Sequence, residues 1–301
     1  MQTRILPFNE KSIAEAVRLI FAGEPVAMPT ETVYGLAADA TNAKAVARIY
    51  EAKGRPSFNP LIVHVPDLEA AQDFGVFSVD ALELAKSHWP GPLTLVVPLR
   101  EGAGIASIVT AGLSTIGLRV PAHPAMQALL RASGRPLAAP SANASGSISP
   151  TRASHVQKSL GGRVPLIIDG GATERGLEST IVAATGRPLR LLRPGPIVVD
   201  AETSSGEKIE APGQLASHYA PAKSLRLNAT SAEADEYLIG FGDIAGDASL
   251  SPSADLVEAA ARLFDLLHEA DASKKPRIAV ARVPDDGLGT AINDRLRRAA
   301  A

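Results

Sequence analysis

The amino-acid sequence predicts a mixed α/β protein, with a large domain built on a twisted sheet and a smaller α/β domain after it. Short apolar runs recur over residues 25–192, with helical patterns between several of them. Because these runs are apolar throughout, we expect a sheet that is covered on at least one face. Small and polar residues fill positions 201–212, which is the composition of a linker, and a further set of strand and helix patterns follows.

The elements expected in the large domain begin with a helix over residues 9–22. Asn9 caps this helix, Gly23 ends it, and apolar residues recur between them at helical spacing. Further helices are expected at 43–51, 79–88 and 123–133, the last ending at Gly134. Strands are expected at 25–29, 61–65, 93–99, 115–120, 137–139, 166–169, 180–183 and 189–192. These elements make a domain over residues 1–204.

The smaller domain is expected over residues 223–301, after a linker at 205–222. Its strands are expected at 224–227, 237–241 and 277–281. A helix is expected to start at Ser253, whose side chain can cap it, and to carry Leu256, Ala260, Leu263, Phe264 and Leu267 on one face. A unit of roughly 80 residues buries little surface, so we expect its core to depend on docking to the first domain.

Composition narrows the class of protein. The chain is 46% hydrophobic and 21% charged, as is ordinary for a globular protein, so dominant disorder is not expected. It contains no cysteine, which excludes disulfides, thiolate metal sites and cysteine nucleophiles. The N-terminus lacks a secretory signal, and no apolar run approaches the ~18 residues that span a bilayer. We therefore expect a cytoplasmic protein with no membrane contact.

Charge is unevenly distributed along the chain. Residues 101–200 carry ten Lys and Arg against five Asp and Glu, whereas residues 201–301 carry eleven basic against sixteen acidic side chains. The basic middle favours an anionic ligand such as a nucleotide or RNA, and the acidic tail argues against a nucleic acid covering the whole protein. The alternative is an ordinary fluctuation of surface charge.

Two polar segments follow early strands. Thr30, Glu31 and Thr32 form a polar rim after residues 25–29, where α/β sheets usually bind ligands, although the two threonines would also suit a turn that bonds only local backbone. Lys53 and Arg55 flank a glycine, which lets the backbone approach a phosphate while both charges converge on it.

His64 and Arg119 are candidate ligand contacts within strands. A lone histidine in an apolar strand is usually a core residue, but His64 follows the Lys-Gly-Arg loop closely. Alternation along residues 115–120 places Thr115, Gly117 and Arg119 on one face, which suits a carboxylate or phosphate partner for the arginine. The alternative for Arg119 is an edge strand with a solvated side chain.

A loop at 138–151 is rich in small and hydroxyl residues. Its hydroxyl groups, backbone amides and one asparagine would suit a nucleotide, although the composition also fits a flexible linker. A hydroxyl turn at 176–180 and an arginine–glycine turn at 192–195 are similar in kind. The sequence has no phosphate loop, no His-Glu-x-x-His zinc site and no nucleophile elbow. Any nucleotide site is therefore of an unusual type.

These segments, together and in this order, resemble the signatures of the YrdC-like threonylcarbamoyl-AMP synthases. They read Pro-Thr-Glu-Thr-Val-Tyr-Gly-Leu at 29–36, Lys-Gly-Arg-Pro with a later Asn-Pro-Leu and histidine at 53–64, and Pro-Ser-Ala-Asn-Ala-Ser-Gly at 140–146. His-Tyr-Ala-Pro at 218–221 and the acidic tail resemble the family's long form. The resemblance covers essentially the whole chain. It implies a large mixed twisted-sheet YrdC-like domain and a smaller Rossmann-like α/β C-terminal domain, joined by an ordered linker.

The resemblance implies a reaction and its site. The enzyme would be a nucleotidyltransferase, an L-threonylcarbamoyladenylate synthase, that converts L-threonine, bicarbonate and ATP to threonylcarbamoyl-AMP and pyrophosphate. A tRNA-modifying partner complex would receive the product and modify adenosine 37 of tRNA. Lys53 and Arg55 would be catalytic. Threonine would be bound by Thr32, His64, Arg119, Ala139 and Ser179, and ATP by Lys53, Arg55, Asn59, Thr115, Ser141, Asn143, Ser149, Arg193 and Tyr219.

Three further expectations accompany this resemblance. No carboxylate cluster is visible, so Mg²⁺ is expected to be held mainly by ATP phosphates, with no metal ligands from the protein. Residues 213–221 are expected to fold over the nucleotide as a lid, with Tyr219 contacting it, rather than only to dock the C-terminal domain. Weak RNA binding by the basic middle segment stays open.

Two rival functions were weighed against this resemblance. The carbamoyltransferase domain of hydrogenase maturation proteins is related, but those proteins carry cysteine-rich zinc modules and this chain has no cysteine. A non-catalytic RNA-binding module would account for basic residues such as Arg131, Arg135, Arg152 and Arg163. It would leave the hydroxyl-rich loops and the tyrosine of the linker unexplained.

Overall fold

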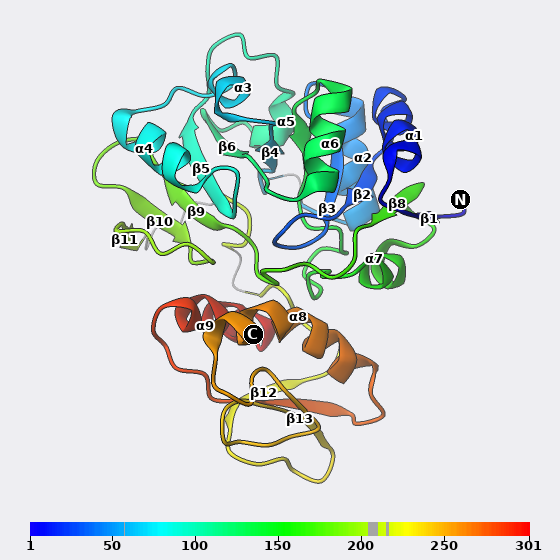
Figure 1. Cartoon of the computed structure of the whole chain (residues 1–301), viewed down its shortest axis with the longest axis vertical. Helices are drawn as coiled ribbons and strands as arrows, with labels where there is room; N and C mark the ends of the chain where they lie inside the picture. The colour runs from blue at the N-terminus through cyan, green and yellow to red at the C-terminus, as the bar shows by residue number, and fades with distance from the viewer. Residues whose placement is uncertain (57, 204–209, 215–216) are drawn as a thin grey trace.

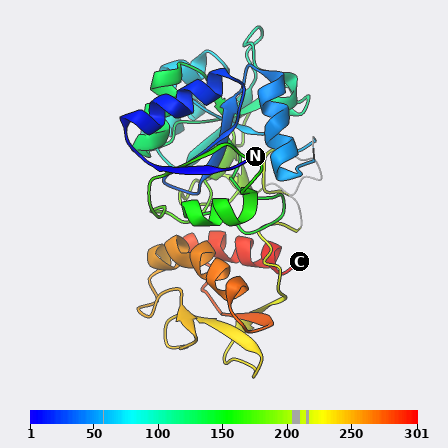
Figure 2. The ribbon, with the colours of Figure 1, turned by 90° about the vertical axis from the view of Figure 1, so that its right-hand side faces the viewer.

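A computed structural model describes residues 1–56, 58–203, 210–214 and 217–301. Figure 1 shows a large domain above a smaller one, with two helices of the smaller domain lying between its sheet and the large domain, and Figure 2 shows the same order of layers from the side. The predicted mixed α/β class with two domains is confirmed.

The large domain is built on a mixed sheet of eleven strands within the described residues. β4 and β6 are parallel neighbours in the middle of this sheet, and their register places His64 opposite Arg119. In spatial order the strands are β1 (Arg4–Pro7), β8 (Leu166–Asp169), β2 (Val26–Met28), β3 (Gly35–Asp39), β7 (Leu137–Ala138), β4 (Ile62–His64), β6 (Thr115–Arg119), β5 (Leu93–Pro98), β9 (Thr180–Ala183), β10 (Arg190–Arg193) and β11 (Glu202–Thr203).

Helices cover the two faces of this sheet unequally. α1 and α6 pack together on one face over residues such as Val26 and Met28, while α2, α4, α5 and α7 cover the other face, over Val63 and Leu95 among others. The helices are α1 (Glu10–Phe21), α2 (Ala43–Lys53), α3 (Leu68–Gln72), α4 (Val79–His88), α5 (Ser107–Thr110), α6 (Pro124–Ser133) and α7 (Ala153–Leu160). Asn9 caps α1 and Gly134 ends α6 in the left-handed conformation, as the sequence predicts.

Part of the face that carries α1 and α6 is left for a binding site. Over β4, β5, β9 and β10 the buried residues Ile62, Val96, Ile181 and Leu192 pack with Ala211 of the linker rather than with a described helix. The linker therefore lies on the sheet where a covering helix would otherwise be needed to bury these side chains.

The small domain has a parallel sheet in the order β12 (Leu225–Ala229), β15 (Arg277–Ala281), β13 (Glu236–Gly240) and β14 (Ala248–Ser249). Its helices are α8 (Leu256–Ala272) and α9 (Leu288–Ala299), and both lie on the side of the sheet that faces the large domain (Figure 1). The large-domain residues Val33, Ile148 and Leu177 belong to the same buried apolar cluster as these helices. The core of the small domain thus extends into the large one, as its size predicts.

The structure corrects some expected elements. The side chain of Asp255, and not of Ser253, caps α8 by accepting the N–H groups of Val257 and Glu258. The strands β1, β3, β11 and β14 were not expected. Within the described residues, no helix combines the length and apolar character needed to cross a bilayer.

Candidate active site

A closed cavity of about 50 Å³ lies on the helix-free part of the large sheet. Nine of the fourteen residues expected to bind substrates line it: Thr32, Arg55, His64, Arg119, Ala139, Ser141, Ser179, Arg193 and Tyr219. These residues come from segments spread over most of the chain, so the fold brings the motifs together. All five residues expected to bind threonine are among them.

Five expected ATP ligands do not line this cavity: Lys53, Asn59, Thr115, Asn143 and Ser149. Thr115 begins β6 and Arg119 ends it, so the two lie about 13 Å apart along the strand. The cavity therefore coincides with the expected threonine site and with only part of the expected nucleotide site.

The polar rim after β2 serves two purposes. Thr30 Oγ1 donates to Val33 O at 2.7 Å and lies 2.8 Å from Thr32 Oγ1, so Thr30 bonds locally, as a turn residue would. Because the Thr30 hydroxyl proton is used, Thr32 is the donor in the contact between the two hydroxyls. Thr32 also lines the cavity with its remaining lone pairs. The turn interpretation is therefore confirmed for Thr30, whereas a ligand role for Thr32 stays a prediction.

Arg119 is buried against Glu31. Its Nη2 lies 2.6 Å from Glu31 Oε1, and Glu31 Oε2 accepts the N–H of Ala122 at 3.1 Å. Burial alone would raise the pKa of the Glu31 carboxyl, but Arg119 outweighs it and holds that pKa below its usual value. The alternative of a solvated arginine on an edge strand is wrong, because β6 lies between β4 and β5 and Arg119 is buried.

His64 faces the cavity as a neutral imidazole. Burial, aided by the charge of Arg119, lowers the pKa of His64 to about 3. Its Nδ1 has no hydrogen-bond partner among the described residues, although it is buried. An unpaired buried polar atom is costly, so this nitrogen is available to a ligand group.

Lys53 and Arg55 sit at the end of α2, which Gly54 terminates in the left-handed conformation at φ 61°. Lys53 Nζ donates to Ser141 O and Asn143 O, both at 2.5 Å, and so holds the hydroxyl-rich loop. Arg55 donates to Pro60 O at 3.0 Å. Lys53 and Arg55 are only 3% and 8% exposed, so both cations are buried rather than solvated.

Burial favours the uncharged forms of Lys53 and Arg55. It holds the pKa of Lys53 well below its usual range and lowers the pKa of Arg55 to about 10. An anionic ligand would oppose both shifts, because a nearby negative charge favours the protonated form. Lys53 and Arg55 would therefore be fully charged when an anionic ligand binds next to them.

Arg193 and Ser179 are joined across the cavity wall. Arg193 donates to Ser179 O through Nε at 3.0 Å and Nη2 at 2.9 Å, and Nη2 lies 3.1 Å from Ser179 Oγ. Ser179 Oγ also bonds Thr94 Oγ1 at 2.7 Å. Burial lowers the pKa of Arg193. Arg193 therefore holds the turn that carries Ser179 and supplies positive charge to the same wall.

The linker closes the cavity. Pro212, Gly213, His218 and Tyr219 line it, while residues 205–209 and 215–216 of the predicted linker lie outside the described part of the chain. Gly213 has φ 83°, and a Cβ there would lie 2.8 Å from the Tyr219 hydroxyl, so only glycine fits. Tyr219 itself has φ 66°, a strained conformation for a bulky residue and one that is typical of functional sites.

Unsatisfied polar atoms concentrate at this site. Among the described residues, eight buried side-chain N or O atoms lack a hydrogen-bond partner, and five of them belong to the expected ligands or to the linker beside them. These five are Asn59 Oδ1, His64 Nδ1, Asn143 Oδ1, His218 Nδ1 and Tyr219 OH. Native structures rarely leave such atoms unpaired, so the cluster marks a place where ligands supply the missing partners.

The sequence motifs did not single out every residue that shapes the cavity. Glu178 and His218 line it, and the partner of Glu178 is Arg295 of α9, 2.8 Å away. Glu178 and His218 lie within quoted motifs and were available to inspection, whereas nothing in the sequence around Arg295 marks it. The described residues contain no group of three or more His, Asp or Glu placed to hold a metal ion.

The mixed sheet, the hydroxyl-rich loops and the cluster of buried cations define a YrdC-like α/β protein with a site for anionic substrates. Two family profiles match the chain: one described as "Telomere recombination" (Sua5, YciO and YrdC) over residues 18–195, and one described as "Threonylcarbamoyl-AMP synthase, C-terminal domain" over residues 177–301. The chain belongs to the threonylcarbamoyl-AMP synthase family, in its two-domain Sua5 form.

Relatives that match over the full chain agree with this placement. The threonylcarbamoyl-AMP synthase of Bacillus subtilis is 42% identical, and the alignment covers 98% of this chain and 94% of the relative. The crystal structure of Pyrococcus abyssi Sua5 with L-threonine superimposes with a TM-score of 0.89 at 36% identity, covering 99% of this chain and 97% of that one. A structure of the same protein with a consecutive histidine and tyrosine both changed to alanine matches equally, with a TM-score of 0.89 and 35% identity over 99% of this chain and 96% of that one.

Proposed function

We propose that this chain condenses L-threonine, bicarbonate and ATP to threonylcarbamoyl-AMP, with release of pyrophosphate and water. The observation that carries the proposal is the meeting of all five expected threonine ligands, with Arg55, Ser141, Arg193 and Tyr219, in one closed cavity. The P. abyssi relative, whose structure holds L-threonine, supports the assignment of the amino acid.

The reaction needs positioned charge rather than a covalent nucleophile. The amino group of threonine and bicarbonate form a carbamate with loss of water. A carbamate oxygen then bonds to the α-phosphorus of ATP while the bond to pyrophosphate breaks. Arg55 and Arg193, which both line the cavity, would stabilise the charge that grows on the phosphoryl oxygens. Arg119 binds the threonine carboxylate, and neutral His64 presents an uncharged nitrogen to the amino acid.

ATP needs more room than the closed cavity offers. Ligand pockets usually enclose roughly 300–1,000 Å³, whereas this cavity is about 50 Å³. The side chains that fill the missing space include Tyr219 and His218 of the linker. We therefore expect His218 and Tyr219 to move aside to admit ATP and to return over it once it is bound. The relative with its histidine and tyrosine replaced concerns the same kind of dipeptide, which occurs once here, at 218–219.

The proposal includes Mg²⁺ that enters the site bound to ATP. Among the described residues, Glu178 lines the cavity and is paired with Arg295, and Glu31 beside it is paired with Arg119, so neither presents a free carboxylate. When bound, the ion would neutralise phosphate charge. ATP phosphates and water would hold it.

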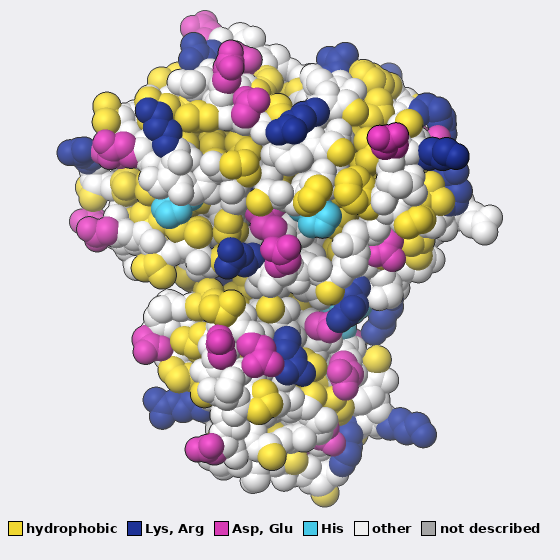
Figure 3. All heavy atoms as spheres, in the orientation of Figure 1, with side chains coloured by type: hydrophobic (Ala, Val, Ile, Leu, Met, Phe, Trp, Pro, Cys, Tyr) yellow, Lys and Arg dark blue, Asp and Glu magenta, His cyan; other side chains and the backbone are white. Residues whose placement is uncertain are grey.

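The proposal also covers the enzyme class, the cellular location and the partner complex. Transfer of AMP to the carbamate makes the enzyme a nucleotidyltransferase, which acts in the cytoplasm and passes its product to a complex that modifies adenosine 37 of tRNA. A stand-alone RNA-binding role has less support. The basic residues of the middle segment are largely paired with acids elsewhere, as in Arg152–Asp265 and Arg187–Asp80, and Lys and Arg are interspersed with Asp and Glu on the face in Figure 3.

The proposal is tested by mixing the purified chain with threonine, bicarbonate and ATP and measuring threonylcarbamoyl-AMP by mass. The product should form only with all three substrates, and replacing threonine with valine should reduce it strongly, because a buried polar group would then lose its partner. Gel shift with tRNA in parallel tests the alternative. Tight RNA binding without threonine-dependent pyrophosphate would favour the RNA-binding role.

A further inference from the structure

Arg295 is a fully buried arginine that the small domain inserts into the large one. Its Nε lies 2.8 Å from Glu178 Oε2, and its Nη2 donates to Pro194 O at 3.0 Å, so it spans the two turns beside Ser179 and Arg193. Asp294, its neighbour on α9, takes Nη1 at 2.7 Å. Arg295 is fully buried, which is rare for a guanidinium unless its donors have hydrogen-bond partners. Its three partners therefore fix the position of its side chain.

The partner of Arg295 is an acidic residue in a site built for anions. Glu178 lines the cavity, and its other oxygen accepts the hydroxyl of Ser149, an expected ATP ligand. A buried carboxylate at this position would repel ATP phosphates unless a cation neutralised it. Burial would raise the pKa of Glu178, but Arg295 and Arg193 outweigh it and keep the carboxyl ionised.

Arg295 also supports the lid. Its guanidinium carbon lies 5.2 Å from the centre of the Tyr219 ring, within the range of a cation–π contact. The ring centre of Tyr219 also lies 4.0 Å from that of His218 and 5.6 Å from that of Phe264 in α8. Two side chains of the small domain, Arg295 and Phe264, thus contact the ring of Tyr219.

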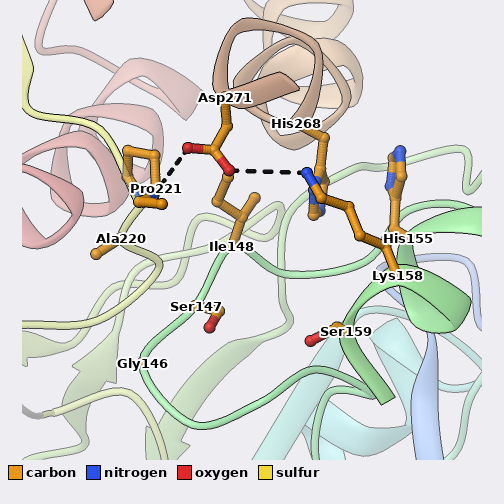
Figure 4. Close-up of a pocket in the computed structure, with 11 residues that line it drawn as sticks. Gly146, Ser147, Ile148, His155, Lys158, Ser159, Ala220, Pro221, His268 and Asp271 are labelled. Carbon is orange, nitrogen blue, oxygen red and sulfur yellow. Dashed lines mark hydrogen bonds and ion pairs between the residues drawn. The ribbon is translucent and has the colours of Figure 1, made fainter. Parts of the chain in front are cut away.

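Some other contacts between the domains lie away from the cavity. Arg152 and Asp265 form a half-exposed pair at 2.7 Å. Figure 4 shows a second cavity, of about 360 Å³, between the loop of Ser147 and α8, with Lys158 and Asp271 3.8 Å apart on its rim. The interface between the domains therefore contains a cavity at this end. At Arg295, by contrast, it is buried and contacts the cavity residue Glu178.

We propose that Arg295 is a positioning residue for the reaction, which neutralises Glu178 in the cavity wall and holds Tyr219 over the cavity. The catalytic site is then complete only while the small domain is docked. This inference rests on the proposed function. It adds that the C-terminal domain contributes a charge to the site rather than only covering it.

The test uses the full chain with three variants, checked for folding by circular dichroism. Arg295→Met leaves Glu178 charged and unpaired, and Arg295→Met with Glu178→Gln removes both charges. Arg152→Ala removes the distant ion pair and serves as the matched control. Binding of a non-hydrolysable ATP analogue is measured by calorimetry at pH 6 and pH 8, and kcat and KM for ATP are measured in the product assay.

Arg295→Met should weaken analogue binding at least about tenfold at pH 8, as expected for an unpaired charge near the phosphates. The loss should be smaller at pH 6, because without Arg295 the buried Glu178 has a raised pKa and is protonated more readily. The double variant should regain most of the affinity for the analogue at both pH values. Arg152→Ala should bind the analogue like the wild type.

Wild-type affinity in Arg295→Met would overturn the inference. So would a loss that is independent of pH and that Glu178→Gln does not rescue, since that pattern belongs to a purely structural arginine. If the double variant fails to fold, neutralisation of Glu178 is not the role of Arg295 and the inference fails. These outcomes are separate from the proposed function, which fails if the wild type binds the analogue but forms no threonylcarbamoyl-AMP.

Discussion

The guanidinium of Arg119 and the carboxylate of Glu31 meet 2.6 Å apart at the wall of the cavity, with both side chains 5% exposed. The pair fixes the orientation of the Arg119 guanidinium, and neither residue can be removed alone without leaving a buried charge. Mutational effects at this site therefore combine loss of binding with loss of stability, and the experiments below separate the two.

Arg119→Ala should weaken threonine binding by about 1.5–3 kcal/mol, the contribution of a charged hydrogen bond, and lower the free energy of unfolding by about 3–5 kcal/mol, because Glu31 is left uncompensated. Glu31→Gln with Arg119→Met should recover stability but not threonine binding. Calorimetric titration and urea denaturation measure the two quantities. Unchanged threonine affinity in Arg119→Ala would contradict the assignment.

Lys53→Ala and Arg55→Ala should each reduce pyrophosphate release by about 2–4 kcal/mol of transition-state stabilisation. Because Lys53 also holds the backbone of Ser141 and Asn143, its removal should lower the melting temperature as well. Lys44→Ala, at an exposed position of the same helix, is the control and should leave both unchanged. Near wild-type release by either site variant would remove it from the phosphate site.

Tyr219→Phe and Tyr219→Ala should differ sharply. The hydroxyl has no partner among the described residues, so Tyr219→Phe should keep the melting temperature while weakening ATP binding. Tyr219→Ala should cost about 3–5 kcal/mol of stability, because the ring is buried against Phe264. Tyr219 is therefore expected to contribute to stability as well as to ATP binding.

Lid closure itself is measured by limited proteolysis. Chymotrypsin cleavage after Tyr219 should slow when ATP and threonine are added together. A rate that is the same with and without ligands would show that residues 213–221 only dock the small domain.

The protein should lose stability as pH falls below about 6.5. Burial lowers the pKa of His64 and His218 to about 3 and of His155 and His268 to about 4. A histidine with a depressed folded pKa binds its proton mainly in the unfolded state, so stability rises with pH between these values and the unfolded pKa. Between pH 7 and pH 5 we expect a loss of about 2 kcal/mol for each of the four histidines, because pH 5 lies above all four folded pKa values.

Urea denaturation across this range measures the dependence on pH. His155 and His268 are stacked at the domain interface with ring centres 3.9 Å apart, so protonation should also weaken docking. His268→Gln keeps a donor for Ser149 O and should reduce the slope. A stability that is flat from pH 7 to pH 5 would contradict the burial of these rings.

Mg²⁺ should be required for activity but should bind only with ATP. Calorimetric titration of the ligand-free chain with Mg²⁺ should show no binding, and the same titration in the presence of an ATP analogue should show it. Tight binding without nucleotide would reveal protein ligands that the paired carboxylates Glu31 and Glu178 do not offer.

Local patterns predicted most of the fold. Helix 79–88 and strand 277–281 have the predicted bounds, because apolar periodicity and flanking caps are local properties. β3 was missed since its sequence, Gly-Leu-Ala-Ala-Asp, has no β-branched residue, and it is a strand because β2 and β7 pair with it on either side. The cap of α8 moved from Ser253 to Asp255 for a similar reason, since several nearby residues can cap and packing selects the start.

The sequence by itself determined the family and the candidate site residues, because motifs such as Lys53–Arg55 and His218–Tyr219 are local patterns that can be read along the chain. Only the tertiary structure decided which charges are paired, how far the cavity is closed, and that the small domain supplies Arg295. Arg295 and Glu178 are 117 positions apart. No local pattern relates two such residues, and their attraction becomes strong only where folding removes them both from water.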